Sequence, residues 1–252
     1  MNVGANPKPD RVAELQVALM LLTRLPAGRL KDEAPAMGAT TWAWPLVGLV
    51  TGAISAVAFS LAVWVGLPPM MAAILALATG ILATGGLHED GLADLADGLG
   101  GGRTRDQKLE IMRDSQIGSY GTMALILCLG FRVSAIASYP DVIWALIGLA
   151  AASRAALPMA LTLLPPARAD GLGHAATGGA LPQALFAVGI GFICLIPLGF
   201  GTALLAALAM AVAITVLGVI VLRQIGGQTG DVMGAMQQIG EVVGWAILII
   251  CL

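Results

Sequence analysis

The stretch Thr202–Leu222, TALLAALAMAVAITVLGVIVL, contains no charged residue and no proline. An α-helix rises about 1.5 Å per residue, so a helix over these 21 residues is long enough to cross the hydrocarbon core of a bilayer. Lipid offers no hydrogen-bond partners to the backbone, and a helix satisfies its backbone groups internally. The stretch therefore predicts a membrane-spanning helix.

The rest of the chain has the same apolar character. Of its 252 residues, 58% are hydrophobic and 11% are charged, whereas soluble domains are about 25% charged. Further apolar segments cover approximately residues 41–67, 70–86, 120–138, 142–164 and 184–198. A last segment, 242–252, is too short to cross unless it begins within the polar loop expected over 223–241. No alternating pattern indicates a barrel. We predict one integral membrane domain over residues 1–252, an all-α polytopic transmembrane helical bundle with six to seven spans.

The segment before the first span predicts an amphipathic helix that lies at the membrane interface. Within residues 11–25, apolar side chains recur at helical spacing (Val12, Leu15, Leu19 and Leu22), with Arg11, Glu14 and Arg24 elsewhere. At the start of the first span, Trp42 and Trp44 are expected to anchor it at the interface.

The basic residues predict the orientation of the chain. With six full spans, eleven of the 13 Lys and Arg residues fall on one side of the membrane: Lys8, Arg11, Arg24, Arg29, Lys31, Arg103, Arg105, Lys108, Arg113, Arg168 and Arg223. The turns near residues 68, 140 and 200 carry none. By the positive-inside rule, the charged side is the cytoplasm. The other two, Arg132 and Arg154, lie within spans.

Residues 86–119 concentrate the charge of the chain. Nine of its 28 charged residues fall between Glu89 and Glu110. If this part is helical, Asp90, Asp94 and Asp97 stand at i, i+4 and i+7 and share one face. Three like charges repel each other, and nothing in the local sequence neutralises them. Carboxylate oxygens suit Mg²⁺, which fills its remaining positions with water and substrate phosphate.

We therefore predict a cytoplasmic acidic catalytic segment over residues 86–119 that holds Mg²⁺. The expected ligands are Glu89, Asp90, Asp94, Asp97 and Asp114. A solvated acidic face is the alternative reading of the cluster, and a helix cap is the alternative for Asp114.

Other residues are candidates for substrate binding. Asp231 lies in GGQTGDVMGA with Gly227 and Thr229, where glycines allow a backbone to approach a ligand closely. Arg132 and Arg154 are costly inside a bilayer unless they find partners, so they either form internal salt bridges or hold a phosphate or pyrophosphate. His88, beside the acids, is either a general base or a polar boundary residue.

Three motifs resemble those of the cobalamin synthase family, the adenosylcobinamide-GDP ribazoletransferases. They are GGLHEDGLADLADGLGGG at 85–102, KLEIMRDSQIGSYG at 108–121, and GGQTGDVMGA at 226–235; the chain length, the number of spans and TRLP at 23–26 also match. The resemblance implies a bacterial or archaeal inner-membrane enzyme of late corrinoid synthesis. Such an enzyme joins adenosylcobinamide-GDP to alpha-ribazole, or to its 5′-phosphate, and releases GMP with magnesium as cofactor.

The resemblance also implies roles for individual residues. Glu89, Asp90, Asp94 and Asp97 match the acidic motif of the family, Asp114 matches the acid of I-M-x-D-S-x-I-G, and Asp231 that of G-G-x-T-G-D. The implied reaction is in-line attack by the ribose 3′-hydroxyl of alpha-ribazole on the phosphorus attached to the cobinamide aminopropanol. Glu89, Asp97 or His88 would accept the proton. The expected partners are the two substrates and the bilayer, without nucleic acid; a homo-oligomer is left open.

Two other functions compete with this one. CDP-alcohol phosphotransferases of lipid synthesis also place acids at a membrane face, but their D-G-x-x-A-R pattern is absent, because Asp94 follows Ala93 here. A transporter would have discontinuous spans in repeated halves, and no internal repeat is visible.

Overall fold

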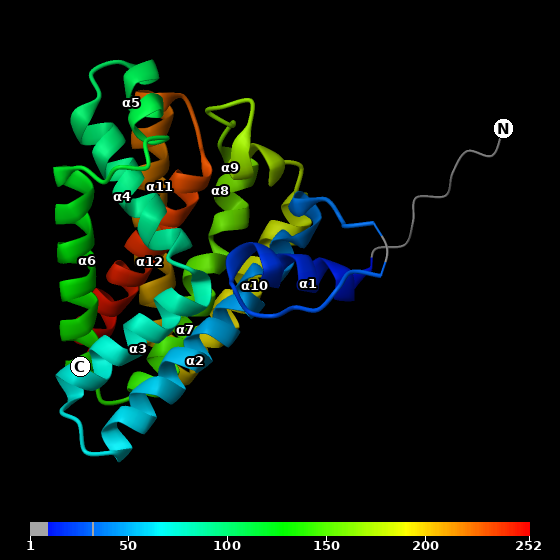
Figure 1. Ribbon diagram of the computed structural model, residues 1–252. Coiled ribbons are helices and arrows are strands. Elements are labelled where there is room, and N and C mark those ends of the chain that lie inside the picture. Colours follow the sequence, from blue (N-terminus) through cyan, green and yellow to red (C-terminus); the bar gives the residue numbers. More distant parts are fainter. Residues whose placement is uncertain (1–9, 32) are drawn as a thin grey trace.

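The computed structural model describes residues 10–31 and 33–252 and is a helical bundle (Figure 1). Over these residues the helices are α1 (Arg11–Leu22), α2 (Trp44–Trp64), α3 (Pro69–Thr84), α4 (Leu87–Gly101), α5 (Arg105–Ile111), α6 (Ser119–Ser138), α7 (Val142–Ala155), α8 (Leu157–Leu163), α9 (Gly171–Ala175), α10 (Leu181–Leu195), α11 (Phe200–Ile225) and α12 (Gly230–Ile250). Short 3₁₀ helices, Met37–Ala43 and Ile196–Leu198, precede α2 and follow α10. The described residues contain no β-strand, which confirms the predicted all-α fold.

Six helical segments of the described residues are long and apolar enough to cross a membrane. They are Met37–Trp64, Ser119–Ser138, Val142–Leu163, Leu181–Leu198, Phe200–Ile225 and Gly230–Ile250. The last of these shows that the C-terminal segment begins within the expected loop. Helix α12 begins at Gly230, and its 21 residues are long enough for a crossing. The polar loop expected over 223–241 is correspondingly wrong. Only residues 226–229 connect α11 to α12.

The predicted span over 70–86 is a bent pair of helices. Helix α3 has 16 residues, about 24 Å, and is too short to cross alone. It is long enough for a span only together with α4, from which it is bent by 90°. Gly85 and Gly86 form the corner with φ of 69° and 74°, a left-handed conformation that glycine adopts without a Cβ clash. Counting the pair as one crossing gives seven.

Helix α4, which carries the acidic motif, packs within the bundle. The sequence placed all of residues 86–119 outside the membrane-embedded bundle, but the structure packs α4 against α6 and α12 (Figure 1). A Cβ on Gly91 would lie 3.2 Å from the Cα of Gly234 in α12, and one on Gly121 in α6 would lie 2.8 Å from the carbonyl oxygen of Ala93. Only residues 102–118, with α5, form the connection beyond the bundle.

Helix α1 packs against the 3₁₀ helix Met37–Ala43 through a charged residue as well as apolar ones. Glu14 is buried and accepts a 2.5 Å hydrogen bond from Nε1 of Trp42, whereas Val12 is 76% exposed. Trp44 was expected at the interface but is 3% exposed and belongs to the core near α1. These indole rings are therefore packing residues of the α1–α2 junction.

The order of the crossings places the segments that carry the basic residues on one side of the membrane. With seven crossings, the segments before α2, between α4 and α6, between α8 and α10, and between α11 and α12 share one side, the charged side. Every basic residue assigned there from the sequence lies in or beside these segments, except Lys8, which is outside the described residues. The turns after α2, α6 and α10 form the opposite side.

Candidate active site

The acidic motif is helical, as the spacing predicted, and its carboxylates differ in burial along α4. Asp90 is exposed, Asp94 is half-buried, and Asp97 is 7% exposed. Asp94 lies within electrostatic range of Asp90, Asp97 and Asp231. Among the described residues, no side chain forms an ion pair or hydrogen bond with the carboxylate of Asp90 or Asp94. This pair therefore keeps its oxygens free for a ligand.

Both carboxylate oxygens of Asp97 accept hydrogen bonds from the backbone of α6 and its N-terminal cap. Its Oδ2 accepts a hydrogen bond from the backbone nitrogen of Gly118 at 2.7 Å, and its Oδ1 accepts one from that of Gly121 at 2.9 Å. These groups lie at the start of α6, where backbone N–H groups lack helical partners and the helix dipole favours a negative charge. The sequence predicted Asp97 as a metal ligand and a base, whereas in the structure it joins α4 to α6.

Close contact between α4 and α12 brings Asp231 to the acidic face. A Cβ on Gly91 would lie 2.8 Å from the carbonyl oxygen of Asp231, so only glycine permits this approach. The Asp231 carboxylate accepts a hydrogen bond from the Thr229 hydroxyl at 3.2 Å and lies 3.5 Å from a guanidinium nitrogen of Arg168. Burial lowers the pKa of Arg168 below its ordinary value, yet a guanidinium stays charged at neutral pH. Arg168 thus places a positive charge beside the acids.

The glycine-rich connection before α12 is held by backbone pairing with the segment after α8. The Gln228 nitrogen donates to the carbonyl oxygen of Pro165, and the Ala167 nitrogen donates to that of Gln228, each at 2.8 Å. Gly227 has φ of 152°, and a Cβ there would lie 1.9 Å from the Pro165 oxygen. Thr229 caps α12 through its hydroxyl. Gly227 and Thr229, predicted to bind substrate, therefore also shape the loop that presents Asp231.

A second polar cluster lies deeper in the bundle, around Arg132 of α6. Its guanidinium is 2.6 Å from Glu241 and 3.8 Å from Glu89, and it donates to Oε1 of Gln238 at 2.8 Å. Gln238 in turn donates to Oε1 of Glu89 at 2.8 Å. An internal salt bridge was one of the two roles predicted for Arg132. This salt bridge is present, and it connects α4, α6 and α12.

Arg154 and His88 border the same deep cluster. Arg154 is 4% exposed and donates to the Ala150 carbonyl oxygen within its own helix. It shares a cavity of about 30 Å³ with Glu89 and Arg132, which is room for about one or two water molecules. His88 is 3% exposed, and its Nε2 has no hydrogen-bond partner among the described residues. Both groups are therefore enclosed by the bundle.

Sequence reasoning missed the α12 side chains that complete this cluster. Gln237, which donates to the Ser153 hydroxyl at 3.0 Å, Gln238 and Glu241 are all buried. They lie in the segment that was read as a loop because it is polar. The detectable signal was their spacing: Gln237 and Glu241 stand at i and i+4, and Gln238 and Glu241 at i and i+3, as on one helix face.

The donor set fits a magnesium ion bound through few protein ligands. Within residues 10–31 and 33–252, no three His, Cys, Asp or Glu side chains lie close enough together to hold a metal ion alone. Asp114 is exposed and accepts a hydrogen bond from the backbone nitrogen of Gln116 at 3.0 Å, which is the cap-like role named as its alternative. Mg²⁺ commonly takes one or two carboxylates plus water and substrate phosphate, and Asp90 and Asp94 offer such oxygens.

Comparison with known proteins supports a single family. The family model described as cobalamin-5-phosphate synthase matches residues 14–249. The chain is 48% identical over 240 residues to an adenosylcobinamide-GDP ribazoletransferase of Bradyrhizobium diazoefficiens, covering 92% of this chain and 91% of the relative. A protein of the same name from Mesorhizobium japonicum is 43% identical over 232 residues, with 91% and 90% covered. No solved structure matches the chain.

Proposed function

The chain belongs to the cobalamin-5-phosphate synthase family, and from this membership we propose that it joins adenosylcobinamide-GDP to alpha-ribazole or to alpha-ribazole 5′-phosphate. The products are adenosylcobalamin, or its 5′-phosphate, and GMP. The bond that forms joins the ribose 3′-oxygen to the phosphorus on the cobinamide side. The bond that breaks joins this phosphorus to the bridging oxygen of the pyrophosphate, which leaves with GMP.

The structural observation that supports the proposed chemistry is the free pair of carboxylates on α4, Asp90 and Asp94. They lie where α4 meets Asp231 of α12, in the half of the bundle that adjoins the charged side. Asp97 and Glu89, in contrast, already bond to the protein. Two carboxylates repel a negatively charged pyrophosphate, and a cation bound between them would remove this repulsion.

Asp90 and Asp94 would hold Mg²⁺ in this proposal, with Asp231 beside them. When bound, the ion would supply positive charge to pyrophosphate oxygens as GMP leaves. Arg168 would add a guanidinium from the loop after α8, whose fork geometry suits phosphate oxygens. Proton acceptance by Glu89, Asp97 or His88 stays a prediction, as does Asp114 as a further ligand.

The buried polar cluster around Arg132 would hold α4 in position. Arg132 is enclosed by the bundle, so we propose that it fixes α4 through Glu89 and Gln238. Arg154 lines the same small cavity as Glu89 and would add positive charge beside it. We also propose that the charged side faces the cytoplasm of the cell inner membrane, since eleven of the 13 basic residues lie on that side.

Release of GMP tests the proposed function. Protein purified in detergent and then reconstituted should release one GMP for each alpha-ribazole consumed when it receives adenosylcobinamide-GDP and Mg²⁺. Chelation with EDTA should stop release, and added Mg²⁺ should restore it. If folded protein releases no GMP in the presence of both substrates and the metal, the proposal is wrong.

A further inference from the structure

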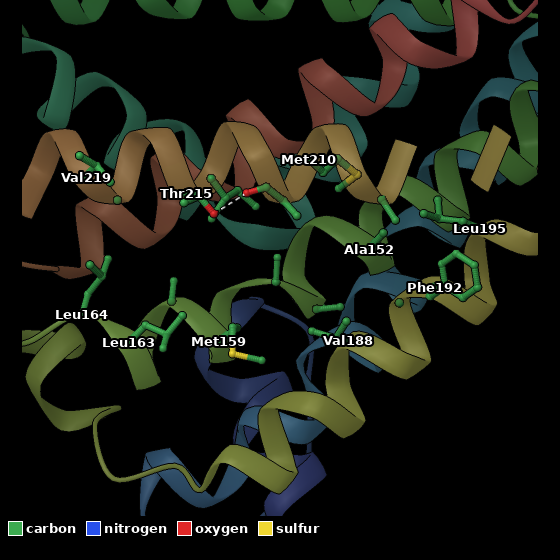
Figure 2. A pocket seen from close by; sticks show the side chains of 18 of the residues that line it. Ala152, Met159, Leu163, Leu164, Val188, Phe192, Leu195, Met210, Thr215 and Val219 are labelled. Atoms are coloured by element: carbon green, nitrogen blue, oxygen red, sulfur yellow. Dashed lines mark hydrogen bonds between the residues drawn. The ribbon is translucent and has the colours of Figure 1, made fainter. Parts of the chain in front are cut away.

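A large apolar groove lies on another side of the bundle, between α8, α10 and α11 (Figure 2). Its volume is about 480 Å³, and it is lined by aliphatic and aromatic side chains such as Met159, Phe192 and Val219. Thr215 supplies the hydroxyl in the wall, and that hydroxyl already donates to the Ala211 carbonyl oxygen at 2.7 Å. The groove therefore offers no free polar side chain and suits a purely hydrocarbon occupant.

The groove lies within membrane-spanning segments and opens outward. At its edge, Leu163 is 71% exposed, Leu222 is 45% exposed and Val188 is 40% exposed. In a membrane, such exposed apolar side chains contact lipid. Along α11 the wall extends from Ala207 to Leu222, which is about 22 Å at 1.5 Å per residue. One leaflet contributes about 15 Å of the hydrocarbon core, so the wall is long enough to hold one acyl chain over a full leaflet.

A cation stands at the end of the groove on the charged side. Val219 and Leu222 are the last residues of α11 in the wall, and Arg223 directly follows Leu222 and stands four residues after Val219. Residues four apart on a helix are neighbours on one face. Arg223 is exposed, and among the described residues no side chain forms an ion pair with it. A basic residue next to the charged-side end of an apolar groove matches the anionic headgroup and the tail of one lipid molecule.

We propose that this groove binds an anionic phospholipid, with one acyl chain between α8, α10 and α11 and its phosphate at Arg223. The site is separate from the carboxylates of α4, so its occupancy does not depend on the proposed reaction. A bound lipid would fill space between α10 and α11 and so support the α11–α12 pair that carries Asp231.

Groove-filling substitution tests the proposal. Thr215→Phe places a ring in the groove, whereas Val216→Phe adds the same ring at a neighbouring residue that is 54% exposed and outside the groove lining. Each protein is purified from membranes containing phosphatidylglycerol and phosphatidylcholine, and retained lipid is counted by native mass spectrometry. We expect one phosphatidylglycerol per wild-type chain, the same for Val216→Phe, and at least about tenfold less for Thr215→Phe, which corresponds to about 1.4 kcal/mol.

The headgroup contact has its own test. Arg223→Gln should lower the preference for phosphatidylglycerol over phosphatidylcholine about fivefold, as expected for loss of one basic contact, whereas Arg29→Gln should leave it unchanged. Equal lipid retention by Thr215→Phe and Val216→Phe overturns the proposal. So does displacement of the lipid by adenosylcobinamide-GDP, which would identify the corrinoid as occupant. A change in protomer number that is specific to Thr215→Phe would identify a second copy of the chain instead and equally overturns it.

Discussion

Asp94 and Asp97 lie on the same face of α4 but differ in their hydrogen-bond partners. Asp97 bonds to two backbone nitrogens at the start of α6, while Asp94, less than one turn earlier, has no such partner among the described residues. The same residue type in the same motif is thus structural at one position and available for a ligand at the other. Substitution can separate the two roles.

Asp94→Asn should remove activity without removing the fold. The change takes away one negative charge from a crowded acidic face, so the unfolding temperature of the purified protein should stay the same or rise. Loss of a ligand that positions charge against the pyrophosphate should lower kcat by a factor on the order of 10² to 10³. Asp106→Asn, on the exposed surface of α5, is the matched control and should keep wild-type kcat. A near wild-type rate for Asp94→Asn would remove Asp94 from the site.

Asp97→Ala should destabilise the protein. It leaves two backbone N–H groups at the α6 start without their acceptor, and we expect a loss of about 1–2 kcal/mol in the free energy of unfolding. Denaturation in detergent, followed by circular dichroism, measures this loss. Glu110→Gln removes an exposed carboxylate from α5 and should have no comparable effect. Unchanged stability of Asp97→Ala would contradict the assignment of Asp97 to the α6 terminus.

At the scale of elements, the contact of α4 with α12 assembles the site. It is possible because glycines face each other: a Cβ on Gly91 would meet the Asp231 backbone, and one on Gly234 would lie 3.1 Å from the His88 oxygen. The two helices carry the acids from positions about 140 residues apart in the chain to one place. The spacing between these helices therefore sets the geometry of the carboxylates.

Gly91→Ala should push α4 away from α12. Overpacking of this kind costs about 1–3 kcal/mol, and the displacement of Asp94 from Asp231 should lower kcat as well. Gly130→Ala in α6 is the matched control, because no atom lies within 4 Å of a Cβ placed there. Unfolding and GMP release should both be measured. If Gly91→Ala behaves like Gly130→Ala, the close helix contact is not required.

At the scale of the whole molecule, the bend at Gly85 and Gly86 determines the number of crossings. With α3 and α4 as one bent span, seven crossings place the C-terminus opposite the charged segments. Reporter proteins fused after Asp170, Gly199 and Leu252 should therefore report the cytoplasm, the periplasm and the periplasm. A cytoplasmic signal from the fusion at Leu252 would show that the α3–α4 pair, or α12, does not cross.

Five of the spans and the acidic motif could be predicted from the sequence because each depends on local composition. Long apolar runs must be helical in lipid, so residues 202–222 and their counterparts were recognisable without any tertiary information. The helical spacing of Asp90, Asp94 and Asp97 is likewise local, and α4 is helical as expected. The motifs also sufficed to indicate the family, which the comparisons confirmed.

Only the tertiary structure shows which partners the polar residues of these helices have. The sequence read Gln237, Gln238 and Glu241 as part of a loop because polar side chains are costly in lipid, but Arg132, Ser153 and Glu89 compensate them inside the bundle. Charge alone also could not show that the start of α6 lies against the Asp97 carboxylate and donates hydrogen bonds to it. Composition determines which segments enter the membrane, whereas partners distant in sequence determine which buried charges are paired and which carboxylates remain free to bind a ligand.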